Sequence, residues 1–256
     1  MRILIGISAA LVIGLASPAS ADPAIWDGFY IGANAGYGWQ DSEFVMEEGG
    51  AWSTVDPQIQ SVIADGGTGD MDADGILGGI HGGFNFAFDR WVAGFEADIS
   101  FTSLEDTRTE GPLTEPVNNL DFTFRQDIKT TYLATLRPRF GLSIKQTLFF
   151  VTGGLAVAEV EVGSAITGQL DPMATGPDYT SYGSTTDTLF GWTIGAGFEE
   201  MFAPNWSFKA EYNYYDFEDA TFSSNSTAAA YPGYSESVDV DLDMHVVRAG
   251  ISYHFN

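Results

Sequence analysis

Alternation between apolar residues and small or polar ones dominates this chain from Phe29 onward. Between Phe29 and Trp39 every second residue is apolar, while the positions in between carry Tyr, Gly or Asn. In a β-strand, successive side chains point to opposite faces of the sheet. One face of this segment therefore suits hydrocarbon, and the other suits small or hydrated neighbours. The same alternation recurs as far as the C-terminus.

Eight segments carry this pattern, and the connections between them alternate between short and long. The predicted strands cover residues 28–40, 75–88, 91–103, 122–140, 147–162, 188–199, 206–217 and 244–255. The long connections cover residues 41–74, 104–121, 163–187 and 218–243. A membrane β-barrel has an even number of strands, short periplasmic turns and long external loops. The chain is therefore predicted to form an all-β, eight-stranded antiparallel transmembrane β-barrel, an up-and-down meander with four long external loops.

Two strands fit the pattern less simply than the others. In the fourth, Ile128 is expected to face outward and Lys129 inward. In the fifth, Glu159 and Glu161 share the parity of the outward residue Val151. Either a β-bulge switches the faces of this strand, or these two acids stand above the membrane.

A soluble eight-stranded barrel with a ligand cavity is the structural alternative, because its strands also alternate. Such a barrel would line its cavity with Trp91, Phe95 and Tyr132 and would expose the Gly-rich face that holds Glu96. Tryptophans near the predicted strand ends fit the aromatic girdles of a membrane barrel instead. The membrane barrel is the favoured interpretation.

The N-terminus is typical of a secretory signal peptide, predicted to be cleaved after residues 1–21. Arg2 supplies the positive charge, residues 3–16 form an apolar run, and residues 19–21 are small. The apolar run is short for a membrane-spanning helix. Residues 22–256 are then the outer-membrane barrel domain. Since the chain has no Cys, disulfides and Cys-based metal sites are excluded.

The chain is strongly acidic, with 35 Asp and Glu against 10 Lys and Arg. A surface of this sign repels nucleic acid and attracts cations. The acids concentrate in the predicted loops, since residues 41–74 hold several acids and neither Lys nor Arg. Nucleic acid is therefore excluded as a partner.

Several stretches carry a resemblance to a known family. They are Trp26–Gly32, Trp91–Asp98, Gly191–Gly197, Lys209–Tyr212 and Val247–Phe255. The chain resembles the small outer-membrane β-barrel proteins of proteobacteria, of the opacity and OmpA-like type, particularly the alphaproteobacterial surface-antigen branch. This resemblance implies insertion into the outer membrane of a Gram-negative bacterium by a barrel assembly machinery, contact with lipid and lipopolysaccharide, and no enzymatic activity. Asn256 is a departure, because the family commonly ends on the aromatic residue.

Charged residues on the predicted inner faces form the main candidate site. They are Glu96, Asp98, Arg137, Arg139, Lys209, Glu211 and Arg248. Opposite charges on one face of neighbouring strands can pair, and a barrel of this size is filled by its own side chains. The expected result is a structural plug of salt bridges in the lumen. The alternative is a gate whose pairs switch partners and let small ions pass.

Other candidate chemistry is weaker. Residues 70–75 copy the start of an EF-hand loop, but His81 stands where that loop needs a bidentate Glu. His81 and His254 fall on predicted inner faces, and His245 lies near the outer end of the last strand. No Ser motif completes a catalytic triad with these histidines. No catalytic, cofactor or metal site is therefore predicted from any of these residues. Weak divalent-cation binding by the loop acids stays open.

The predicted loops contain aromatic residues and one helix signal. The aromatic residues are Trp52, Tyr179, Tyr182, Tyr231 and Tyr234, and exposed aromatics of this kind suit recognition. Asp56 is a suitable N-cap for a short helix over residues 56–63. The sequence thus predicts a monomeric, non-enzymatic outer-membrane surface protein that contributes to envelope structure. A narrow channel and a loop-mediated adhesin are the alternatives.

Overall fold

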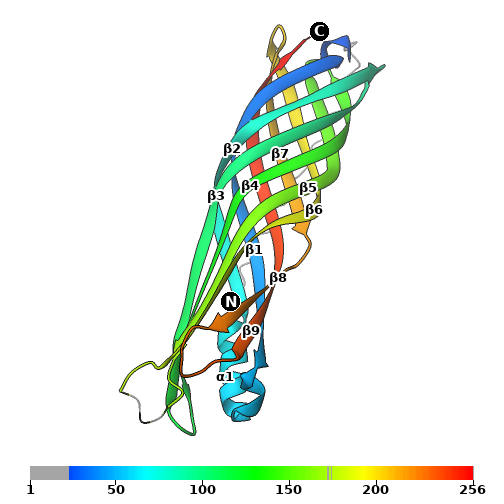
Figure 1. Cartoon of the computed structure of the whole chain (residues 1–256). Helices are drawn as coiled ribbons and strands as arrows, with labels where there is room; N and C mark the ends of the chain where they lie inside the picture. Colours follow the sequence, from blue (N-terminus) through cyan, green and yellow to red (C-terminus); the bar gives the residue numbers. More distant parts are fainter. Residues whose placement is uncertain (1–22, 172, 174, 256) are drawn as a thin grey trace.

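The computed structural model describes residues 23–171, 173 and 175–255, and most of them belong to one antiparallel sheet. Its strands are β1 (Gly28–Gly50), β2 (Gly69–Phe88), β3 (Trp91–Glu115), β4 (Leu120–Ile144), β5 (Thr147–Gly168), β6 (Tyr179–Ala203), β7 (Trp206–Phe217), β8 (Ala220–Ser226) and β9 (Tyr234–His254). Strand β1 pairs with β9 and closes the ring. Strands β7 and β8 pair with successive parts of β9 and so occupy one position in a ring of eight. The predicted eight-stranded up-and-down barrel is confirmed (Figure 1). The predicted signal peptide, residues 1–21, lies outside the described residues.

The two ends of the barrel differ. At one end, two-residue turns join β2 to β3, β4 to β5 and β6 to β7. Asp89, Lys145 and Asn205 in these turns have φ angles of 53°, 58° and 63°, in the left-handed region that tight hairpin turns require. At the other end lie the tips of the long hairpins and helix α1 (Pro57–Gly67), at the bottom of Figure 1. These are called the short-turn end and the hairpin end below.

The hairpin end corrects the prediction of four long loops. Strand β1 runs on to Gly50, and β3 and β4 leave only residues 116–119 between them. Strands β5 and β6 are likewise separated only by residues 169–178. The regions predicted as long loops are therefore largely a continuation of the barrel wall.

Strand β9 shows why the wall continues. Its inward side chains are apolar from Val238 to Val246 and become mostly polar from Arg248 to His254. Its outward side chains change in the opposite sense at the same place, from Asp239, Asp241, Asp243 and His245 to Val247, Ala249 and Ile251. Near the short-turn end the barrel is therefore apolar outside, whereas near the hairpin end it is apolar inside. The second arrangement is stabilised by burial of apolar surface from water.

The apolar interior of the hairpin end is called the hairpin core. It includes Phe44, Met46, Leu104, Phe122, Phe124, Ile128, Val160, Leu242 and Met244. Helix α1 packs on β1, β3 and β4 and buries Ile59 and Ile63 against this core. The Asp56 carboxylate accepts a hydrogen bond from Gln58 N at 2.9 Å, which confirms the predicted helix cap. No helix in the described part of the chain is long and apolar enough to cross a membrane.

Exposure of the strand residues rejects the soluble alternative. Phe95 is 58% exposed, whereas its neighbour Glu96 is 3% exposed. The outward face carries a continuous apolar belt near the short-turn end. Its members include Phe29, Ile31, Ile80, Phe86, Phe101, Leu136, Val151, Leu155, Phe190, Ile194 and Ile251. An apolar belt around a polar lumen is the arrangement of a transmembrane barrel.

The predicted faces of β4 are wrong before residue 132 and correct after it. The register of β4 against β5 shifts between Thr130 and Tyr132, so along the strand the inward residues change from even to odd numbers. Ile128 is consequently buried in the hairpin core, and Lys129 points outward. A β-bulge of this kind inserts one residue and exchanges the faces of a strand.

Strand β5 keeps one parity along its length. Val160 and Val162 face inward, and Glu159 and Glu161 face outward at the hairpin end. The second alternative for these acids therefore holds, since the wall that carries them lies beyond the apolar belt.

We expect Leu242→Ala to lower the free energy of unfolding by about 2–5 kcal/mol, because it opens a cavity in the hairpin core. Asp241→Asn, one residue away but outward, should stay within about 0.5 kcal/mol or stabilise slightly. Urea unfolding of the protein in detergent micelles, followed by tryptophan fluorescence, measures both. Equal, small effects of the two variants would mean that the hairpin end is not a packed core.

Candidate functional site: the charged lumen

The seven charged residues predicted for the lumen lie together inside the barrel, and none is more than 6% exposed. Strand β3 supplies Glu96 and Asp98, β4 supplies Arg137 and Arg139, β7 supplies Lys209 and Glu211, and β9 supplies Arg248. Strand register places Glu96 opposite Arg137, and Glu211 opposite Arg248. Alternation and register thus bring these side chains to one level of the lumen.

The charged residues of β3 and β4 and those of β7 and β9 form one network across the lumen. Arg137 Nη2 lies 2.8 Å from Glu96 Oε1 and 3.0 Å from Asp98 Oδ2. Lys209 Nζ lies 2.7 Å from Glu96 Oε2, and Arg248 Nη1 lies 2.7 Å from Asp98 Oδ1. Because β3 stands across the ring from β7 and β9, the pairs made by Lys209 and Arg248 connect opposite walls of the barrel.

Glu199 of β6 belongs to the same network, although it was not among the predicted lumen residues. Its carboxylate is buried and lies 2.8 Å from Arg139 Nη2. With Glu199 included, four carboxylates face four basic side chains. The sequence did contain a signal for it. Phe198 was predicted to face outward, so the alternation places residue 199, the last of its predicted strand, on the inner face. We call these eight residues the charge network.

The lumen histidines are held by hydrogen bonds. His81 Nδ1 lies 3.3 Å from Asn34 Nδ2, and its Nε2 lies 2.8 Å from Ser252 Oγ. His254 Nε2 lies 3.1 Å from Glu199 Oε1 and 3.0 Å from Ser207 Oγ. A catalytic triad places its acid and its nucleophile on opposite ring nitrogens, whereas here both contact the same nitrogen. The arrangement around His254 is therefore a buried hydrogen-bond cluster and not a catalytic triad, and the partner of His81 opposite Ser252 is an amide and not an acid.

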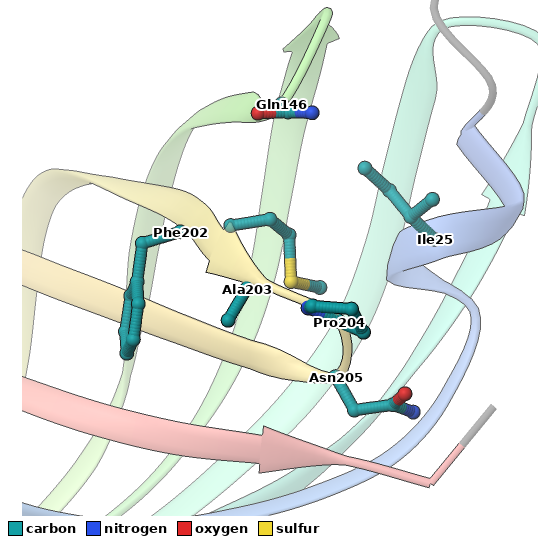
Figure 2. A pocket seen from close by; sticks show the side chains of 7 residues that line it. Ile25, Gln146, Phe202, Ala203, Pro204 and Asn205 are labelled. Carbon is teal, nitrogen blue, oxygen red and sulfur yellow. The ribbon is translucent and has the colours of Figure 1, made fainter.

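Apolar side chains adjoin the charge network on both sides. On the short-turn side, Trp26 of the 3-10 helix η1 (Pro23–Trp26) is fully buried and donates from Nε1 to Ser143 Oγ at 3.1 Å. Trp26 packs in a cluster with Val92, Leu148, Phe150 and Met201, and these five residues are called the short-turn plug below. A cavity of about 590 Å³ lies beside the plug, lined by Ile25 of η1 and Pro204 of the β6–β7 turn (Figure 2). On the other side lies the hairpin core.

A buried carboxylate ties the hairpin end together. Glu236 is 1% exposed and accepts hydrogen bonds from Trp52 Nε1, Tyr179 OH, Ser181 Oγ and Ser224 Oγ, at distances of 2.6–2.8 Å. These donors come from η2 (Ala51–Thr54), β6 and β8. Four neutral donors satisfy both carboxylate oxygens, which a buried charge needs when no cation is present. Glu236 falls within residues 218–243, which were predicted to form a long external loop rich in acids, so its burial is a correction.

The predicted surface aromatics are mostly not at the surface. Trp52 and Tyr179 are fully buried, and Tyr231 and Tyr234 pack against the hairpin core. Only Tyr182 of the five is exposed, at 58%. The correction has a simple cause, since a barrel with an apolar interior needs large side chains to cover its open end.

Acids form a row around the outer wall of the hairpin end. Strand register places Asp216 opposite Asp243, Asp243 opposite Asp41, and Asp41 opposite Asp72. We call these four residues the acid row. Burial and then neighbouring Asp41 raise the pKa of the Asp72 carboxyl, and burial raises that of Asp243. Residues 70–75 lie in extended β2 and have no EF-hand loop conformation.

Comparisons link this barrel to bacterial outer membranes. Residues 7–255 match the family model of the outer membrane protein beta-barrel domain. The chain is 28% identical to the 31 kDa outer-membrane immunogenic protein of Brucella melitensis, over 93% of this chain and 87% of that protein. It is 27% identical to the 22 kDa outer membrane protein of Rhizobium leguminosarum bv. viciae, over 66% of this chain and 67% of the relative. The crystal structure of the outer membrane protein OprG from Pseudomonas aeruginosa matches over 90% of this chain and 97% of its own, with 14% identity and a TM-score of 0.45.

We expect Arg137→Ala to cost about 3–5 kcal/mol of stability, because it leaves the carboxylates of Glu96 and Asp98 partly uncompensated in a buried site. Arg125→Ala, which removes an exposed guanidinium from the outer face of the same strand, should change stability by about 0.5 kcal/mol at most. Urea midpoints of the two variants give the comparison. Unchanged resistance of Arg137→Ala would contradict a tightly coupled network.

The acid row should make stability depend on pH in one direction. A carboxyl whose pKa is raised by folding binds its proton more tightly in the folded state, so its charged form destabilises the fold at neutral pH. This destabilisation is relieved as the pH falls through the raised pKa values of Asp72 and Asp243. Asp41→Asn should therefore raise the urea midpoint at pH 7, and the gain should shrink toward pH 4. Glu200→Gln, an exposed acid at the short-turn end, is the control and should show no such pH dependence.

Proposed function

This chain belongs to the outer membrane protein beta-barrel domain family and is an outer-membrane protein, as its motifs predicted, and we propose that it is a closed, non-enzymatic structural protein of the envelope. The proposal concerns what the barrel does in that membrane. It rests on the filling of the lumen.

The lumen is occupied by three successive layers of side chains. The short-turn plug comes first, the charge network follows, and the hairpin core fills the remainder. A solute crossing the barrel would have to displace apolar layers as well as break ion pairs. This filling is the single observation that carries the proposal.

A gated channel is less well supported by the same contacts. Glu96 is held by Arg137 and Lys209 from two directions, and Asp98 is held by Arg137 and Arg248. If one pair broke, the remaining partner would still hold each carboxylate in place. Exchange of partners in the charge network would also leave Trp26 and the hairpin core across the path.

The outer surface suggests the partners. The apolar belt is bordered by Trp39 and Tyr212 toward the hairpin end and by Trp91 and Trp206 toward the short-turn end. Aromatic girdles of this kind mark the two membrane interfaces. We infer that lipid and lipopolysaccharide surround the belt, that the barrel assembly machinery inserts the chain, and that it functions as a monomer.

Adhesion through the hairpin tips is the second candidate. Val117 at the β3–β4 tip is 57% exposed, and Met173 between β5 and β6 is 87% exposed. Exposed apolar side chains at protruding tips can serve as contact points for a partner. If this role is correct, Val117→Ser with Met173→Ser will abolish binding of whole bacteria to a partner surface while the barrel stays folded.

The decisive measurement for the structural proposal is ion conductance. We expect the purified barrel in planar lipid bilayers to show no discrete openings, because both apolar layers block the lumen. An open porin of the outer membrane recorded in the same bilayers is the positive control. Reproducible openings that Arg137→Ala or Arg248→Ala alters would overturn the closed barrel and support the gated channel.

A deletion strain tests the envelope role itself. We expect cells without this protein to become more sensitive to bile-salt detergents, because a lipid-embedded structural protein has been removed. Complementation with the full chain should restore resistance, and complementation with the tip variant Val117→Ser/Met173→Ser should restore it equally. A deletion strain with an intact permeability barrier would argue against the proposed role.

A further inference from the structure

Two carboxylates and an imidazole converge on the outer wall just beyond the apolar belt. Asp41 lies on β1, and Asp243 and His245 lie on β9. One ligand atom from each lies within 4.8 Å of the other two. Strand pairing fixes the arrangement, because Asp41 is registered opposite Asp243, and Trp39 opposite His245. The cluster combines two carboxylates with an imidazole and so differs from the purely acidic surface around it.

The imidazole is held in one orientation. Tyr212 OH lies 2.7 Å from His245 Nδ1. The ring also stacks on Trp39, with centroids 5.9 Å apart and planes at 20°, and on Tyr212, with centroids 6.0 Å apart and planes at 26°. A hydrogen bond on one ring nitrogen that fixes the other for a ligand is the usual support of a metal-binding histidine. Here the supported nitrogen is Nδ1, so Nε2 is the nitrogen that would bind a metal ion.

The carboxylates of Asp41 and Asp243 have no positively charged partner among the ion pairs of the described residues. Asp243 Oδ1 is shielded from solvent and accepts no hydrogen bond from the described residues. Asp41 faces like-charged Asp243 on one side and Asp72 on the other, and directly opposed like charges destabilise a sheet. A bound cation would give Asp243 Oδ1 a partner and would offset the repulsion between the opposed carboxylates.

We propose that Asp41, Asp243 and His245 bind a divalent first-row transition-metal ion, with Zn²⁺ as the reference ion. Two carboxylate oxygens and one imidazole nitrogen are a ligand set that such ions accept, with a fourth, outward position left to water. Ligands at about 2.0–2.2 Å from a tetrahedral ion stand roughly 3.4 Å apart, which small side-chain rotations reach from this geometry. Ca²⁺ needs six to eight oxygen ligands, so the imidazole should favour transition metals over it.

Calorimetric titration of the full chain, folded in detergent, with Zn²⁺ tests the site, and Co²⁺ gives an independent optical readout through its visible ligand-field bands. We expect one tight Zn²⁺ per chain and Co²⁺ bands that Zn²⁺ abolishes. A large excess of Ca²⁺ should leave the Co²⁺ bands in place. Displacement of Co²⁺ by an equal concentration of Ca²⁺ would overturn the proposal and indicate only an acidic surface.

Variants separate a specific site from general charge. His245→Gln should abolish the Co²⁺ bands and weaken Zn²⁺ binding by at least about tenfold, and Tyr212→Phe should weaken it by about tenfold through loss of the support on Nδ1. Asp239→Asn removes an outward acid of β9 outside the cluster and should leave binding unchanged. Heat-modifiable mobility on gels shows that each variant is folded. Wild-type affinity in folded His245→Gln, or equal losses in His245→Gln and Asp239→Asn, would overturn the site.

Discussion

Closure of β1 on β9 is the interaction on which the rest of the structure depends. Within hydrocarbon, an unpaired backbone amide or carbonyl costs several kcal/mol, so a sheet can cross a membrane only if it has no edge. The β1–β9 pairing extends from Tyr30 to Gly50, well past the apolar belt. Closure therefore serves two purposes in one ladder: it removes the edge in the membrane and shapes the wall that encloses the hairpin core.

A closed ring of eight strands is narrow, and this dictates the chemistry of its interior. Side chains that point inward must fill the space and satisfy one another. In the membrane part they do so with balanced charges and hydrogen bonds, whereas at the hairpin end they do so with apolar packing. The same inward parity of β9 carries Leu242 in one layer and Arg248 in the other. The outward parity changes where the surroundings change from lipid to water.

The period-two pattern was enough to predict the barrel, its orientation toward lipid and seven of the eight members of the charge network. It was not enough at the hairpin end, because the outward residues there are acids, and only segments with an apolar outward face were predicted as strands. Asp239, Asp241 and Asp243 alternate with Val and Leu, which is the pattern of a strand whose polar face points outward. The bulge near Thr130 left no signal in composition. The convergence of Asp41 with Asp243 and His245 depends on closure of the ring, which joins segments that are distant in the sequence.

The packed hairpin end has a consequence for antibodies against this protein. On a barrel wall, an accessible surface is built from every second residue of several neighbouring strands, so that Asp41, Asp72 and Asp243 lie side by side although they are remote along the chain. A linear peptide cut from one strand displays both faces at once, including residues such as Leu242 that the intact wall hides. Sera raised against such peptides would recognise the denatured chain, and immunisation that targets living cells would require the folded barrel as antigen.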